Sequence, residues 1–220
     1  ESTPLANPHW DYSRKKIAAE LAFDAAAREA NFPLVTVRPS LTYGDHHIPL
    51  ILNSWTHPYT IIDRMKRGQA VILPGDGASL WTITHADDFA FGLAGLLGNP
   101  QTLGHAFHIT SDESITWRQA YEMAAAAFNV PYIPVEISSH TLAKAYPDWE
   151  GTLLGDKAIS VVFDNSKIKR FVPGFAASIG FAEGMRRAAT WFTEHPGFRT
   201  VEPELDARHT QLAGMYHELE

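Results

Sequence analysis

The chain contains no cysteine among its 220 residues. Disulfide bonds, thiolate metal ligands and a cysteine nucleophile are therefore excluded. The nearest approach to a metal-binding motif is the pair His46 and His47, but no third ligand follows them at a suitable spacing. We therefore expect no metal site, and any covalent chemistry must use other side chains.

Long apolar runs and basic runs are also missing. No stretch approaches the roughly 20 consecutive apolar residues of a membrane span, and no basic and apolar leader opens the chain. The formal net charge is -7 at pH 7, so the electrostatic footprint of a nucleic-acid-binding protein is absent. With 45% hydrophobic residues, the composition predicts a soluble cytoplasmic protein with a full core and without membrane or nucleic-acid partners.

The first residues lack an initiator methionine and contain prolines at positions 4 and 8. The stretch "ESTPLANPHWDY" is typical of an extended loop that enters a helix. We expect the chain to be the later part of a longer protein.

The first elements are typical of an α/β unit. A helix is predicted after Pro8 and up to about Asn31, where an asparagine and a following proline end it. Leu34 to Arg38 is then predicted as a buried strand. Further on, a strand, a Gly-Asp-Gly turn at 75–77 and a second strand with alternating burial through residue 85 lead to a helix, for which we expect Asp87 to be the N-cap.

The second half adds shorter elements. Thr116 and Gln119 have the spacing of a capping box, a strand is predicted at 133–137, and helices follow from about residue 139 and over 181–195. Asn165 and Ser166 are typical of a helix cap. The tail 201–220 carries an apolar stripe at Leu205, Leu212, Tyr216 and Leu219, which predicts a helix packed on its own domain or, as the alternative, on a second copy.

Tyr12 and Lys16 are four residues apart, so they share one face of the first helix. A free tyrosine has a pKa of about 10 and is a poor base at neutral pH. A cation at about 4 Å, at an effective dielectric constant near 20, favours the phenolate by up to about 4 kcal/mol, or roughly three pKa units. The pair is thus a candidate acid/base couple; the alternative is a solvated surface helix.

The surrounding motifs give this pair more weight. "P-x-x-x-Y-x-x-x-K-x-x-A-E", then "LVTVRPSLTYGD", "GDGASLWTITHADDFA" and "FDNSKIKRFVPGFAASIGFAEGMRRAATWF" follow in order. This ordered set resembles the extended short-chain dehydrogenase/reductase family of NAD(P)-dependent epimerases, dehydratases and reductases. The resemblance implies the C-terminal part of a Rossmann-type doubly wound sheet plus a smaller α/β substrate-binding domain.

The resemblance also implies roles for single residues. Tyr12 would be the acid/base, and Lys16 would lower its pKa and bind the nicotinamide ribose of NAD or NADP. Arg38, Pro39 and Ser40 would border the nicotinamide. The alternatives are a strand-end salt bridge for Arg38 and a strand terminator for Pro39.

The chain departs from the family pattern at three places that would contact the cofactor or the substrate. No Gly-x-x-Gly-x-x-Gly follows a first strand, so a pyrophosphate cradle is missing and the chain as given is expected to be inactive. Trp81 and Leu41 stand where the family often has an Arg and an Asn that hold the substrate, although Trp81 and His85 are also typical of packed core. Lys167 and Arg186 are candidates to compensate.

The expected domains follow from these matches. Residues 1–45 and about 82–112 would belong to the dinucleotide-binding domain, about 46–81 and 113–200 to the substrate-binding domain, and 201–220 to a C-terminal helix. The expected function is an NAD(P)-dependent epimerase, dehydratase or reductase that acts on a nucleotide sugar or a related hydroxyl or carbonyl substrate, as a homodimer. The alternatives are a carbonyl reductase for a non-sugar substrate and a non-catalytic, RNA-binding-like relative.

Overall fold

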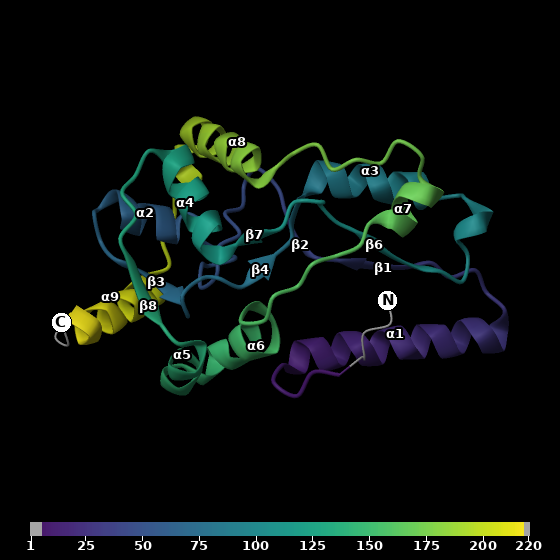
Figure 1. Ribbon diagram of the computed structural model, residues 1–220, viewed down its shortest axis with the longest axis horizontal. Helices are drawn as coiled ribbons and strands as arrows, with labels where there is room; N and C mark the ends of the chain where they lie inside the picture. The colour runs from purple at the N-terminus through teal and green to yellow at the C-terminus, as the bar shows by residue number, and fades with distance from the viewer. Residues whose placement is uncertain (1–5, 218–220) are drawn as a thin grey trace.

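The computed structural model describes residues 6–217 and contains short parallel strands flanked by helices (Figure 1). The strands are β1 Thr36–Pro39, β2 Leu41–Tyr43, β3 Val71–Pro74, β4 Leu80–Trp81, β5 Ile83–His85, β6 Ala106–Ile109, β7 Ile115–Thr116 and β8 Pro134–Ile137. The α-helices are α1 Asp11–Ala30, α2 Thr60–Lys66, α3 Ala86–Leu96, α4 Trp117–Phe128, α5 Ser139–Ala145, α6 Glu150–Thr152, α7 Ser166–Phe171, α8 Phe181–Glu194 and α9 Pro203–His217. Shorter helical turns are η1 Pro100–Thr102, η2 Pro147–Trp149, the π-helical η3 Leu153–Lys157, and η4 Pro196–Phe198. The predicted α/β class is confirmed.

Strand pairing is parallel in three of the four two-stranded sheets: β1 with β6, β2 with β5, and β3 with β8. The pair β4 and β7 is antiparallel. Only Ser40 separates β1 from β2. Their partner strands, β6 and β5, therefore pair with consecutive parts of one stretch of chain, residues 36–43. In Figure 1, α1 runs along one side of the β1–β6 pair and α3 with α7 along the other.

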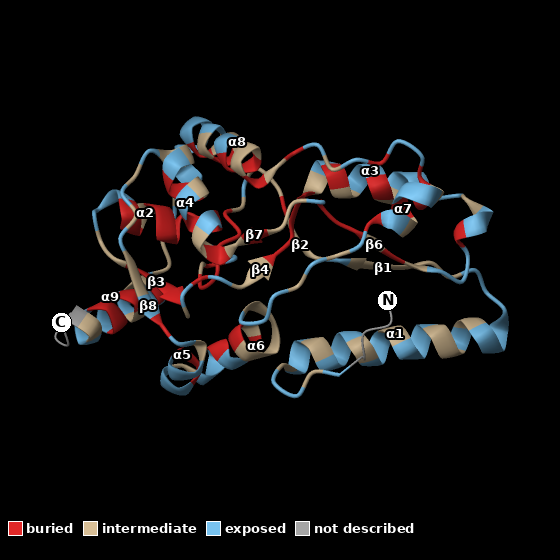
Figure 2. Cartoon of the chain, viewed as in Figure 1, coloured by how far each residue is buried: buried red, intermediate tan, exposed pale blue. Residues whose placement is uncertain are grey.

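The helix α1 matches its predicted extent, because Asn31 adopts the left-handed conformation (φ 50°) that ends it. No residue of α1 is buried (Figure 2). A helix without a buried face needs other attachments. One of them is the ion pair between Glu20 of α1 and Arg38 of β1.

The start of α3 differs from the prediction. His85, not Asp87, is the N-cap: its Nδ1 accepts a hydrogen bond from the Asp87 amide (3.2 Å), and its Nε2 pairs with the Asp45 carboxylate (2.8 Å). The expected packed histidine is thus confirmed. The alternation predicted for the preceding strand is wrong, because Trp81 through His85 are all buried and the segment divides into β4 and β5, which pair with different strands.

Buried residues form two separate clusters (Figure 2). The larger lies among β3, α2, α4 and α8. The smaller lies under α3 and contains Leu96, Phe107 and Ile109 together with Ile168 and Val172. The last two belong to the range predicted for the substrate-binding domain, whereas the first three belong to the range predicted for the dinucleotide-binding domain. The division into two domains stays a prediction.

The helix α9 packs on its own chain, against β3 and α2, as the first of the two sequence alternatives expects. Leu205 and Leu212 are buried, whereas Leu219 lies outside the described residues. Arg64 is buried and donates to the backbone and carboxylate of Asp206. The Thr116 and Gln119 capping box forms as predicted.

Candidate active site

A cleft of about 1010 Å³ lies between α1, the β1–β2 stretch and the segment 152–157. Ligand sites in proteins usually have volumes of about 300–1,000 Å³, so this cleft is large enough for a cofactor fragment and a substrate. Its lining includes six of the predicted site residues, namely Tyr12, Lys16, Arg38, Pro39, Ser40 and Leu41.

The first side of the cleft is the face of α1 that carries Tyr12 and Lys16. Both residues line the cleft, as their four-residue spacing predicts. The residue Tyr12 is 57% exposed, so it is accessible from the cleft that it lines. Its ring lies 4.9 Å from that of Trp10, the residue at the N-cap of α1. A phenol and an ammonium thus border one open space.

The second side is the backbone from β1 into β2. The Arg38 guanidinium bonds both carboxylate oxygens of Glu20, which is the salt bridge that the sequence left as the alternative to a cofactor contact. Ser40 shares a hydrogen bond with Thr84 (3.0 Å). The Thr42 hydroxyl is buried and has no hydrogen-bond partner in the part of the chain that the structure describes. This side therefore combines a fixed backbone with one unused polar group.

The third side is the segment 152–157, which sequence reasoning missed. Thr152, Asp156 and Lys157 line the cleft. The only signal was a charged dipeptide in the mainly apolar stretch "GTLLGDKAISVV". The side chains of Asp156 and Lys157 form an ion pair, and burial raises the pKa of the Asp156 carboxyl above its usual range, against the opposing effect of Lys157.

The segment before α1 fastens the third side to the first. Asn7 donates through Nδ2 to the Gly155 carbonyl (2.7 Å), and the Trp10 ring lies so close to Gly151 that an added Cβ there would come within 2.1 Å of it. His9 and Glu150 add a further contact (3.1 Å). The packing therefore requires glycine at 151. The contact between Trp10 and Gly151 holds Tyr12 near the segment 152–157, which contains Lys157.

The structure does not bring the other predicted substrate residues to the cleft lining. Trp81 is buried in the larger core cluster, where it stacks on Trp117. Lys167 donates from its ammonium to the Ala106 carbonyl on β6 (2.7 Å). Arg186 pairs with Glu183 on the exposed face of α8. Of the predicted substrate set, only Leu41 borders the cleft.

The residues before α7 have structural contacts. Asn165 occupies the N-cap position of α7, as predicted, but its side chain makes no capping hydrogen bond; the Asp164 carboxylate accepts the Ser166 amide instead (2.8 Å). This bond lowers the pKa of Asp164. The Asn165 side chain is buried and donates to the carbonyls of Thr110 and Ser111.

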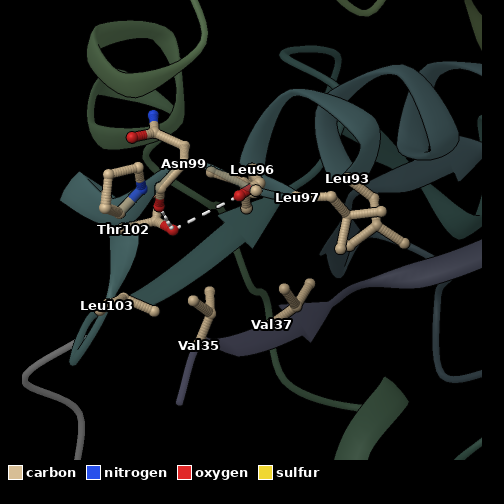
Figure 3. Close-up of a pocket in the computed structure, with 10 residues that line it drawn as sticks. Val35, Val37, Leu93, Leu96, Leu97, Asn99, Thr102 and Leu103 are labelled. Atoms are coloured by element: carbon tan, nitrogen blue, oxygen red, sulfur yellow. Dashed lines mark hydrogen bonds between the residues drawn. The ribbon is translucent and has the colours of Figure 1, made fainter. Parts of the chain in front are cut away.

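A second pocket, of about 360 Å³, lies between β1 and α3 (Figure 3). Val37 of β1 and Val35, which lies just before that strand, face Leu93 and Leu96 across it, and the Thr102 hydroxyl donates to the Asn99 carbonyl (2.7 Å). Its lining has no charged side chain. It therefore offers no group for acid/base chemistry.

Two further searches cover only residues 6–217. Within that range no three His, Asp or Glu side chains are grouped as a metal site would need. No helix there is long and apolar enough to cross a bilayer.

Comparison with known proteins gives the family. Residues 1–110, half of the chain, match the model of the NAD dependent epimerase/dehydratase family. The chain belongs to this family. The resemblance seen in its motifs is thereby confirmed.

Two curated relatives are consistent with this family assignment. The 2'-dehydrokanamycin reductase of Streptomyces kanamyceticus is 32% identical over 145 residues, which are 66% of this chain and 40% of that protein. A trifunctional UDP-glucose 4,6-dehydratase/epimerase/reductase of Arabidopsis thaliana is 23% identical over 84% of this chain and 25% of its own. The chain thus spans less than half the length of the curated relatives it matches.

A solved structure supports the fold. The dTDP-glucose 4,6-dehydratase of Streptomyces venezuelae superposes with a TM-score of 0.68, at 24% identity, over 92% of this chain and 56% of that one. This similarity extends to nearly all of the chain and confirms the Rossmann-type epimerase/dehydratase architecture predicted from sequence.

Proposed function

We propose that the protein is an NAD(P)-dependent oxidoreductase of the epimerase/dehydratase type, acting on a nucleotide sugar or a related hydroxyl or carbonyl compound. The observation that carries this proposal is the meeting of Tyr12 and Lys16 with Arg38, Pro39 and Ser40 around one cleft. These residues come from two separate elements, and chance surface residues would not be expected to border the same space. Family membership supports the same activity.

Tyr12, an exposed residue, would exchange a proton with the substrate oxygen through its hydroxyl. Lys16, on the same face one turn later, would stabilise the phenolate that remains after the proton has left. NAD or NADP, when bound, supplies or accepts the hydride. The cleft fits its nicotinamide end, because the Tyr12 and Lys16 side chains and the backbone from Pro39 to Ser40 line a space of sufficient volume.

The substrate class rests on the relatives and on the cleft. Both curated relatives are named for sugar-derived substrates, and one solved neighbour is a UDP-glucuronic acid epimerase. The Streptomyces kanamyceticus relative is named as a reductase, an activity that the proposed function includes, whereas a carbonyl reductase for a non-sugar substrate is not favoured. An RNA-binding relative is not favoured, since the matched relatives are named as enzymes. The homodimer and the cytoplasmic location stay predictions.

Cofactor binding tests this proposal. With the protein expressed from its complete reading frame, we expect NAD or NADP to bind by calorimetry and Lys16→Met to weaken binding about 10-fold or more, because a charged hydrogen bond is lost. Lys15→Met is the matched control, since Lys15 is 77% exposed and pairs with Asp11 on another face. Absence of binding by the unaltered protein would refute the proposal.

A further inference from the structure

The π-helical turn η3 carries a charged pair, Asp156 and Lys157, at the edge of the cleft. The proton transfer proposed for Tyr12 and Lys16 uses neither residue of this pair. The Lys157 ammonium lies 4.4 Å from the centre of the Trp81 ring and pairs with the Asp156 carboxylate. The two side chains are only 12% and 21% exposed. Both nevertheless line the cleft that contains Tyr12.

The pair is held rigidly. The Ser79 hydroxyl donates to the Lys157 carbonyl (3.0 Å) and so attaches η3 to the segment before β4, and the Ala158 amide donates to the Leu153 carbonyl (2.9 Å) and closes the π-helical turn itself. The buried Trp81 ring makes a cation–π contact with the Lys157 ammonium. Trp81 therefore contacts a residue of the cleft although it does not line the cleft itself.

Burying an ion pair costs free energy unless its remaining hydrogen-bonding capacity is used. Burial raises the pKa of Asp156 even though Lys157 opposes the shift, so the pairing does not fully offset the desolvation. The orphan hydroxyl of Thr42 lines the same cleft. The Thr42 oxygen is itself buried, so the polar groups that a ligand can reach here are those of the partly exposed Asp156 and Lys157 pair.

The charges of the pair select among ligands. A phosphate would be attracted by Lys157 and repelled by Asp156, and a ligand ammonium would meet the reverse. Two adjacent hydroxyl groups satisfy both residues, because one donates to the carboxylate and the other accepts from the ammonium.

We propose that Asp156 and Lys157 together bind neighbouring hydroxyl groups of an uncharged sugar ring, and so position that ring in the cleft with Tyr12. The inference rests on the proposed function and deepens it: the pair selects the sugar, not the nucleotide. It makes Asp156 and Lys157 specificity-determining residues.

The test compares binding of UDP-glucose and UDP to the protein expressed from its complete reading frame, by calorimetry with cofactor present. For Lys157→Met, which keeps the stem over Trp81, and for Asp156→Asn, we expect affinity for UDP-glucose to fall about 10- to 100-fold, because a charged hydrogen bond is lost, while affinity for UDP is unchanged. Lys157→Arg, which keeps the charge, should restore most of the affinity. Lys169→Met is the control, since Lys169 pairs with Asp112 at the surface.

The outcomes separate the two proposals. An equal loss of UDP and UDP-glucose binding would mean that the pair binds the diphosphate, and unchanged binding of both would mean that it binds neither; each result overturns the inference and leaves the proposed function intact. If the unaltered protein bound cofactor but neither UDP nor UDP-glucose, the nucleotide-sugar assignment would fail and the inference with it. Thermal unfolding of each variant separates these results from misfolding.

Discussion

At the scale of single residues, the sequence predicts where a side chain lies when local spacing decides its position. It does not predict the position of a side chain that depends on packing between distant segments. Tyr12 and Lys16 line one cleft because a helix repeats every 3.6 residues. Lys167 and Arg186 were predicted to contact substrate from their charge alone, but the first donates to a β6 carbonyl and the second pairs with Glu183. Nothing local distinguishes such residues from Lys157, whose place depends on Trp81.

His209 provides a residue-scale prediction about pH. It is fully buried, its Nδ1 accepts from the Ile72 amide (3.1 Å) and its Nε2 donates to the Leu52 carbonyl (3.3 Å), so the folded protein holds it neutral. Burial lowers its pKa from 6.5 to about 4. The unfolded chain therefore binds this proton more readily, and stability is lost as pH falls from about 6.5 towards 4.

We expect the free energy of unfolding to fall by about 2 kcal/mol between pH 7 and pH 5 through this residue. Urea unfolding at the two pH values measures it. His209→Gln should show a correspondingly smaller drop, even if it is less stable at both. Identical drops in the variant and the unaltered protein would refute the assignment.

At the scale of elements, helix and strand positions followed from the sequence more reliably than their attachments. The capping box of α4 and the left-handed end of α1 are local, and both are as predicted. The cap of α3 was predicted wrongly because His85 takes that role only when Asp45 and the buried strand fix its ring. The sequence could not show that α7 packs on β6, since that contact joins residues about 60 apart.

The tether of α1 gives an element-scale prediction. α1 buries no residue, and the Glu20–Arg38 ion pair attaches it to β1. Glu20→Gln should therefore speed amide exchange throughout α1 while lowering global stability by only about 1 kcal/mol. Hydrogen–deuterium exchange with mass spectrometry measures the effect.

Glu29→Gln is the control for this change, because Glu29 is exposed on the same helix. Exchange in α1 that was equally fast in both variants, or unchanged in both, would show that the ion pair does not hold the helix.

At the scale of the whole molecule, the cleft is assembled from segments that are distant in sequence. α1, the β1–β2 stretch and residues 152–157 meet there, and Trp10 against Gly151 joins the first to the last. The α/β class and the family could be predicted, because ordered motifs report on the fold as a whole. The third side of the cleft could not, because its position depends on the close approach of a tryptophan to a glycine 141 positions later.

The central claim is that the Tyr12 hydroxyl moves the proton in this cleft. Its most direct test is the turnover number of Tyr12→Phe, in the protein expressed from its complete reading frame, on UDP-glucose, dTDP-glucose and their 4-keto derivatives. Tyr146→Phe is the control, since its hydroxyl bonds Gln211 outside the cleft. We predict a loss of about 10²- to 10⁴-fold for Tyr12→Phe with cofactor affinity retained. Turnover by Tyr12→Phe equal to that of the control would contradict the account.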